Sequence, residues 1–174
     1  MSLIYPSSNL KKELQQLSSP EIITLCLRLA HFKKENKELL TYLLFKADDP
    51  DAFVGEYKEE MDGQFKQIGN KGYFAVKTLR KIASQMNNQI RYAGLEVVKT
   101  ELLLHFCSNY IQFVDLYTSY KPLRNVFYRY AEKTKASIEK LHEDLRHDYG
   151  NLYNEMIENA SQKTHWLEKK SFML

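Results

Sequence analysis

The acidic and histidine residues between positions 139 and 148 come closest to a chemical site in residue type and spacing. Glu139 and His142 are three residues apart, and Asp144 and His147 repeat that spacing. Residues three apart on a helix share a face, so one such pair can reach a single metal ion. Carboxylate-bridged bundle proteins use Glu-x-x-His pairs on two helices together with carboxylates from two others. A metal-carboxylate enzyme around residues 139–148 is therefore one hypothesis for function.

Two features of the sequence argue against that hypothesis. All four residues fall on one expected helix, whereas a dinuclear site needs ligands from several helices. His142 and His147 are five residues apart, whereas the HExxH zinc motif places its histidines four apart. GxSxG, P-loop and GxGxxG motifs are absent from the sequence as well. We therefore expect no catalytic residue, no metal ligand and no cofactor, and interpret His31 and His105 as hydrogen-bonded core or boundary residues.

Charged residues are segregated along the chain. Residues 38–65 hold eight acids and two lysines, and residues 66–99 carry a net charge of +6. Within the basic segment, cations recur at helical spacing beside serine and asparagine and form a stripe: Lys77, Arg80, Lys81 and Arg91. Such a stripe can follow a phosphate backbone, so a nucleic-acid-binding helical protein using residues 77–91 is an alternative function. We favour a solvated face paired with the acidic helix, because the net charge of +3 is small.

An aromatic stripe runs along a helix expected over 95–119. Phe106, Tyr110, Phe113, Tyr117 and Tyr120 are spaced four, three, four and three residues apart. The favoured interpretation is a seam in the core, but tyrosine also suits a partly exposed edge because its hydroxyl needs a polar partner. Tyr110, Tyr117 and Tyr120 are therefore candidate contacts for a protein partner.

The C-terminal tail, residues 161–174, is unusually hydrophobic and includes Trp166. Exposed tryptophan, phenylalanine, methionine and leucine in one place promote association. We expect this tail either to fold back onto its own domain or to bind a second copy or another protein, which makes Trp166 a candidate contact.

Capping and breaking residues define the elements that must position these side chains. Ser19-Pro20-Glu21, with Ser19 as the cap, and Asp49-Pro50-Asp51 predict helix starts, Pro122 predicts another, and Gly94 predicts a helix end. The expected helices lie near 8–17, 20–32, 35–47, 50–67, 72–93, 95–119 and 122–149, with a weaker helix after Gly150. The sequence thus predicts an all-α fold of six to eight antiparallel helices, either a single bundle or a short α-solenoid-like array. The most apolar segments, 20–32 and 102–114, should be the most enclosed.

The length of 174 residues predicts one all-helical domain over 1–160, followed by the tail. With 44% hydrophobic and 27% charged residues, the chain resembles neither a disordered nor a membrane protein. The apolar run Leu3–Tyr5 is too short for a secretion signal, so a cytoplasmic location is expected, with Cys26 and Cys107 as reduced core residues. The favoured function is a non-enzymatic helical protein-interaction module whose partner is another protein or a second copy.

Overall fold

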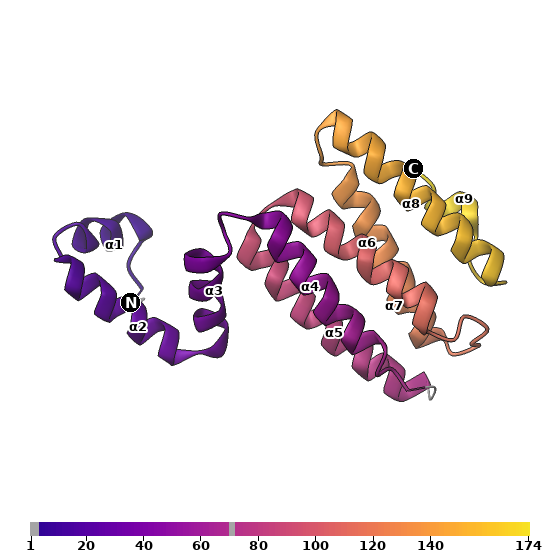
Figure 1. Cartoon of the computed structure of the whole chain (residues 1–174), viewed down its shortest axis with the longest axis horizontal. Coiled ribbons are helices and arrows are strands. Elements are labelled where there is room, and N and C mark those ends of the chain that lie inside the picture. The colour runs from indigo at the N-terminus through magenta and orange to yellow at the C-terminus, as the bar shows by residue number, and fades with distance from the viewer. Residues whose placement is uncertain (1–3, 70–71) are drawn as a thin grey trace. The chain divides into compact units, whose positions relative to one another are not determined.

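The computed structural model describes residues 4–69 and 72–174, and helices account for most of them (Figure 1). Leu3 and Lys71, which enter the sequence predictions, lie outside the described residues. The described residues contain no strand, which confirms the all-α fold class. Their helices are α1 (Ser7–Leu14), α2 (Ser19–Phe32), α3 (Lys34–Phe45), α4 (Pro50–Phe65), α5 (Gly72–Ala93), α6 (Glu96–Phe113), α7 (Lys121–Ile138), α8 (Glu143–Lys163) and α9 (Lys169–Phe172). None of them is long and apolar enough to cross a membrane.

The helix starts follow the predicted capping chemistry with one shift. The cap of α2 is Ser18 rather than Ser19: the Ser18 amide and hydroxyl both donate to the Glu21 carboxylate, at 2.8 and 2.6 Å. At α4 the Asp49 carboxylate accepts a hydrogen bond from the Ala52 amide at 3.0 Å. Both arrangements satisfy amides that have no partner within the helix.

The helix end predicted at Gly94 is confirmed. Gly94 has a φ of 66°, in the left-handed region that glycine adopts at little cost. Its amide donates to the carbonyl of Ile90 at 3.0 Å, which closes the last turn of α5 and directs the chain into α6.

The chain divides at Phe45 and Lys46 into two compact units, whereas the sequence prediction had a single domain over 1–160. In the second unit, α4 to α8 run alternately in opposite directions, as an antiparallel bundle (Figure 1). The helix α6 packs against α4, α5, α7 and α8, and Leu102, Phe106 and Cys107 on it are completely buried. The prediction that 102–114 forms the centre is thus confirmed.

The first unit contains α1, α2 and α3 and has little core. Its only described buried residues are Ala30 and Tyr42, and α1 buries none. The prediction that 20–32 is a central, enclosed helix is therefore wrong. The physical reason is that, among the described helices, α2 packs mainly against α3, and much of the rest of its apolar surface is exposed.

Two predicted helices are shorter than expected. The helix α6 ends at Phe113 because Val114 is extended and the Asp115 carboxylate accepts a hydrogen bond from the Tyr117 amide at 3.0 Å. Such side-chain bonds to nearby amides compete with helix formation. The segment 122–149 breaks after Ile138, and the turn that follows buries Leu141 before α8 begins. Gly150, predicted to precede a weaker helix, lies inside α8.

Candidate functional site

The metal-site hypothesis relied on Glu139 and His142 sharing one helix face, and they do not share a helix. Glu139 ends α7 and His142 precedes α8, so a turn separates them. His142 Nδ1 and Asp144 Oδ2 are 3.5 Å apart, and both side chains are exposed. Over residues 4–69 and 72–174, no cluster of three or more histidine, cysteine, aspartate or glutamate side chains could hold a metal ion.

His105 is part of a polar contact between α4 and α6. Its Nε2 donates to Asp62 Oδ1 at 2.6 Å, and Asn109 Nδ2 donates to the same oxygen at 2.7 Å. Burial raises the pKa of Asp62, but the hydrogen bonds from Asn109 and His105 outweigh it, so the pKa lies below its ordinary value. This arrangement joins two helices, as expected for a satisfied boundary histidine.

The basic stripe on α5 is not paired with the acidic helix α4, so that part of the sequence interpretation is wrong. The ion pairs of α4 join Glu56 to Lys46, Lys58 to Glu101, and Asp62 to His105. In the described part of the chain, no ion pair joins α4 to α5. The reason is that α4 packs chiefly on α6, and its charged contacts follow that interface. The stripe residues Lys77, Arg80, Lys81 and Arg91 are exposed.

A groove of about 570 Å³ lies between α5 and α7 and includes part of this stripe. The helix α5 contributes Arg80, Ala83, Ser84 and Asn87, and α7 contributes Pro122, Asn125, Val126, Arg129 and Tyr130. The lining therefore holds two guanidinium groups, two amides and two hydroxyls, with no carboxylate. Asn87 Nδ2 donates to the Ala83 carbonyl at 2.6 Å and to the Tyr130 hydroxyl at 3.3 Å, which connects the two helices.

A further cation lies beside this groove. The ammonium of Lys133 is 5.1 Å from the centroid of the Tyr130 ring, within cation–π range. Burial, together with the positive charges of Arg129 and Lys99, lowers the pKa of Lys133. Arg129 and Asn125 were not predicted from the sequence. They are four residues apart and so share one face of α7, a spacing from which a second polar stripe could have been predicted.

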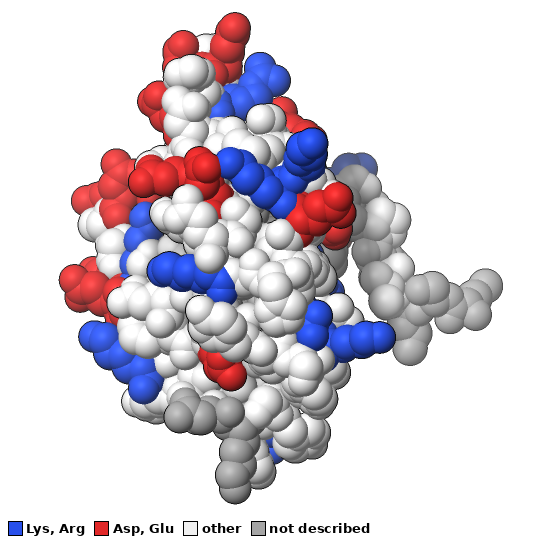
Figure 2. All heavy atoms as spheres, turned by 90° about the vertical axis from the view of Figure 1, so that its right-hand side faces the viewer, with Lys and Arg blue, Asp and Glu red and all other residues white. Residues whose placement is uncertain are grey.

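The charges elsewhere on the surface are arranged differently. On the face seen from the right-hand side of Figure 1, lysine and arginine lie interspersed with aspartate and glutamate (Figure 2). Two ion pairs between partly exposed side chains are Lys169 with Glu158 and Lys46 with Glu56. The lining of the groove between α5 and α7 differs, because it contains two arginines and no aspartate or glutamate to pair with them.

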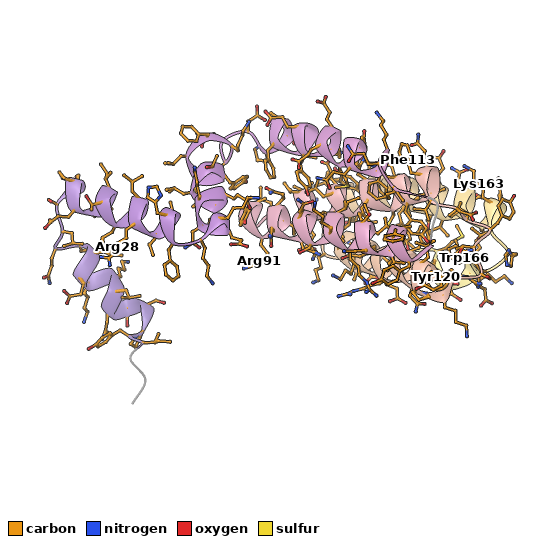
Figure 3. The ribbon with its side chains drawn as sticks, turned by 90° about the horizontal axis from the view of Figure 1, so that it is seen from below. Arg28, Arg91, Phe113, Tyr120, Lys163 and Trp166 are labelled. Carbon is orange, nitrogen blue, oxygen red and sulfur yellow. The ribbon has the colours of Figure 1, made fainter. Side chains whose placement is uncertain are left out.

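The aromatic candidates have different environments. Tyr110 is a core residue rather than a surface contact: it is fully buried, and its hydroxyl donates to the Leu123 carbonyl at 2.9 Å. Burial also raises its pKa well above the ordinary value. Tyr117 and Tyr120 lie in the loop after α6, and are 79% and 39% exposed. Tyr120 lies at the end of the bundle opposite Arg91 (Figure 3).

Trp166 holds the C-terminal tail against α7 and the loop after α6. Its indole Nε1 donates to the Leu116 carbonyl at 2.7 Å, and its own carbonyl accepts from the Tyr128 hydroxyl at 2.6 Å. The Tyr128 ring stacks on Phe172 with centroids 5.4 Å apart. The tail is thus folded back onto the rest of the second unit, and Figure 3 shows Trp166 toward the end of the bundle that lies away from Arg91.

The two cysteines also differ from each other. Cys107 is a reduced core residue as predicted, and burial raises the pKa of its thiol to about 12. Cys26 is reduced but only partly buried, because it lines an apolar groove of about 290 Å³ between α2 and α3. Leucines form most of this groove, at positions 29, 39, 40 and 43.

No protein-family model, curated protein or solved structure matches this chain.

Proposed function

We propose that this protein is a non-enzymatic helical interaction module that self-associates through α2 and α3. The observation that carries the proposal is the exposed apolar surface of the first unit. Leu29 is 61% exposed, Phe32 77% and Phe45 74%, although all three lie on well-formed helices. Covering one such side chain contributes about 1.5–3 kcal/mol, so a partner that covers several is strongly favoured.

The distribution of apolar residues around α2 supports a helical partner. Cys26 and Ala30 lie in the middle of its apolar arc, toward α3. At 100° per residue, Leu25 and Leu29 fall on one flank of that arc, and Leu27 on the other. A helix with so wide an apolar arc is normally packed by neighbours on more than one side. Within the described part of the first unit, α3 is the one helix that packs extensively against α2.

A second copy of the chain is the partner that these features favour. A unit of this size rarely folds stably without disulfides, metals or association, and its one cysteine is reduced. A second copy presents the same pair of apolar helices, so a twofold contact between them is self-complementary. Two such pairs would together supply the helices needed to cover both flanks of each α2.

The test is the molar mass of the full chain by size-exclusion chromatography with light scattering, under reducing conditions that prevent Cys26 disulfides. We expect a dimer for the wild type and a monomer for Leu27→Asp and for Leu29→Asp. The matched control is Leu152→Asp on α8, because Leu152 is 51% exposed, the same fraction as Leu27. A wild-type protein that is monomeric at all concentrations, or α2 variants that stay dimeric, would overturn the proposal.

A further inference from the structure

The groove between α5 and α7 is a second surface, separate from the apolar helices of the first unit. We propose that it binds the sugar-phosphate backbone of a single-stranded nucleic acid, with Arg80 and Arg129 contacting phosphates from its two sides. This goes beyond self-association, and it uses residues that the dimerisation proposal does not involve.

The charge of the groove is the first argument. Arg80 and Arg129 come from helices that are far apart in the sequence, yet they line one groove without any carboxylate. Neither has an ion-pair partner in the part of the chain that the structure describes. Lys133 adds a third positive charge beside Tyr130. Positive charges that share one groove favour the binding of an anion there. A guanidinium group can bind a phosphate through two parallel hydrogen bonds.

The neutral groups of the groove are the second argument. Ser84 on α5 and Asn125 on α7 add a hydroxyl and an amide to the groove that the two arginines line. Such side chains commonly contact phosphate and sugar oxygens and position a strand without reading its sequence. Tyr130 is buried, so its ring offers little area for stacking on a base. We therefore expect binding with little base preference.

The length of the basic stripe is the third argument, and it favours a strand over a small phosphate compound. Lys77 and Arg91 mark the ends of the stripe on α5, and at 1.5 Å per residue they are about 21 Å apart along the helix. This exceeds the length of one phosphate group. The stripe also continues past the groove in both directions, so several phosphates of one strand can be contacted. A positively charged groove between two helices suits the backbone of a single strand.

The experiment measures fluorescence anisotropy of a short fluorescein-labelled oligothymidine with the full chain, over a series of salt concentrations. We expect Arg80→Gln and Arg129→Gln each to weaken binding at least about tenfold at low salt, the loss of a charge-assisted hydrogen bond. Each should also reduce the slope of log affinity against log salt by about 0.7. Arg146→Gln on α8 is the matched control, because Arg146 is exposed and lies outside the groove.

Three outcomes would overturn the proposal. The first is an absence of oligothymidine binding at about 50 mM salt, where backbone contacts are strong. The second is an equal loss of affinity in Arg146→Gln, which would indicate a general charge effect. The third is that inorganic pyrophosphate binds as tightly as the oligonucleotide, which would assign the groove to a small phosphate compound. Molar mass measured on the same samples distinguishes these outcomes from a failure of self-association.

Discussion

At the scale of single residues, the polar side chains of the second unit act mainly as links between helices. Asp62 joins α4 to His105 and Asn109 on α6, and Glu101 on α6 accepts hydrogen bonds from Lys58 on α4 and Tyr149 on α8. Asp62 thus joins two helices, and Glu101 joins three. Arg80 and Arg129 contrast with them, since no carboxylate lies in their groove.

The stability of the chain should depend on pH through Asp62. Its pKa is lower in the folded protein than in the unfolded chain, so its contribution is present above about pH 4 and is lost as pH falls through the folded value. Because its side chain is 39% exposed, we expect that contribution to be below about 1 kcal/mol.

Urea unfolding of Asp62→Asn at a series of pH values measures this effect. The variant should be less stable than the wild type at pH 7, and the difference should shrink at and below about pH 4. Asp48→Asn is the control, because Asp48 is exposed and is not part of this contact. A difference between Asp62→Asn and the wild type that does not change with pH would contradict the prediction.

At the scale of elements, the packing of short segments depends on a few aromatic side chains. The helix α9 has only four residues, and it is held by Phe172 against Tyr128 and by the hydrogen bonds of Trp166. Arg124 lies 5.9 Å from the Trp166 ring centroid and adds a cation–π contact. The tail therefore stabilises the end of the bundle where α7 begins.

We expect Trp166→Ala to lower the free energy of unfolding by about 2–4 kcal/mol, because it removes a large side chain that covers Phe127 and Tyr128. His165→Ala is the control, since the neighbouring His165 is exposed. Thermal or urea unfolding measures the difference. Equal stability of the two variants would show that the tail contributes little to the second unit.

At the scale of the whole molecule, the two units differ in how much they bury. The fully buried large side chains, among them Phe65, Phe106 and Tyr153, all belong to the second unit. The first unit has Ala30 and Tyr42 as its described buried residues. The buried core thus belongs to the second unit, and the self-association that we propose belongs to the first.

A fragment of residues 46–174 should fold by itself into a helical monomer, because it retains this core and loses α2 and α3. Far-ultraviolet circular dichroism with a cooperative melt tests the folding, and light scattering tests the mass. The full chain at the same concentration is the reference. A fragment that is unfolded, or one that still forms dimers, would contradict this prediction.

Local patterns in the sequence were sufficient to predict much of the secondary structure. Helical periodicity and the prolines and capping residues near positions 20 and 50 gave helix positions that agree closely for α2, α4 and α5, because these signals act within one or two turns. The same patterns identified α6 as the centre of a bundle from its nearly continuous apolar residues.

Only the tertiary structure decided which side chains meet. Arg80 and Arg129 line one groove although they are 49 positions apart in the sequence, and Asp62 contacts His105, which is 43 positions away. The sequence alone predicted that the stripe on α5 would be neutralised by α4 and that α2 would be enclosed. Both predictions were wrong because neither charge nor hydrophobicity specifies which neighbour a helix packs against. That choice depends on how all the helices bury their apolar faces together, which no local pattern contains.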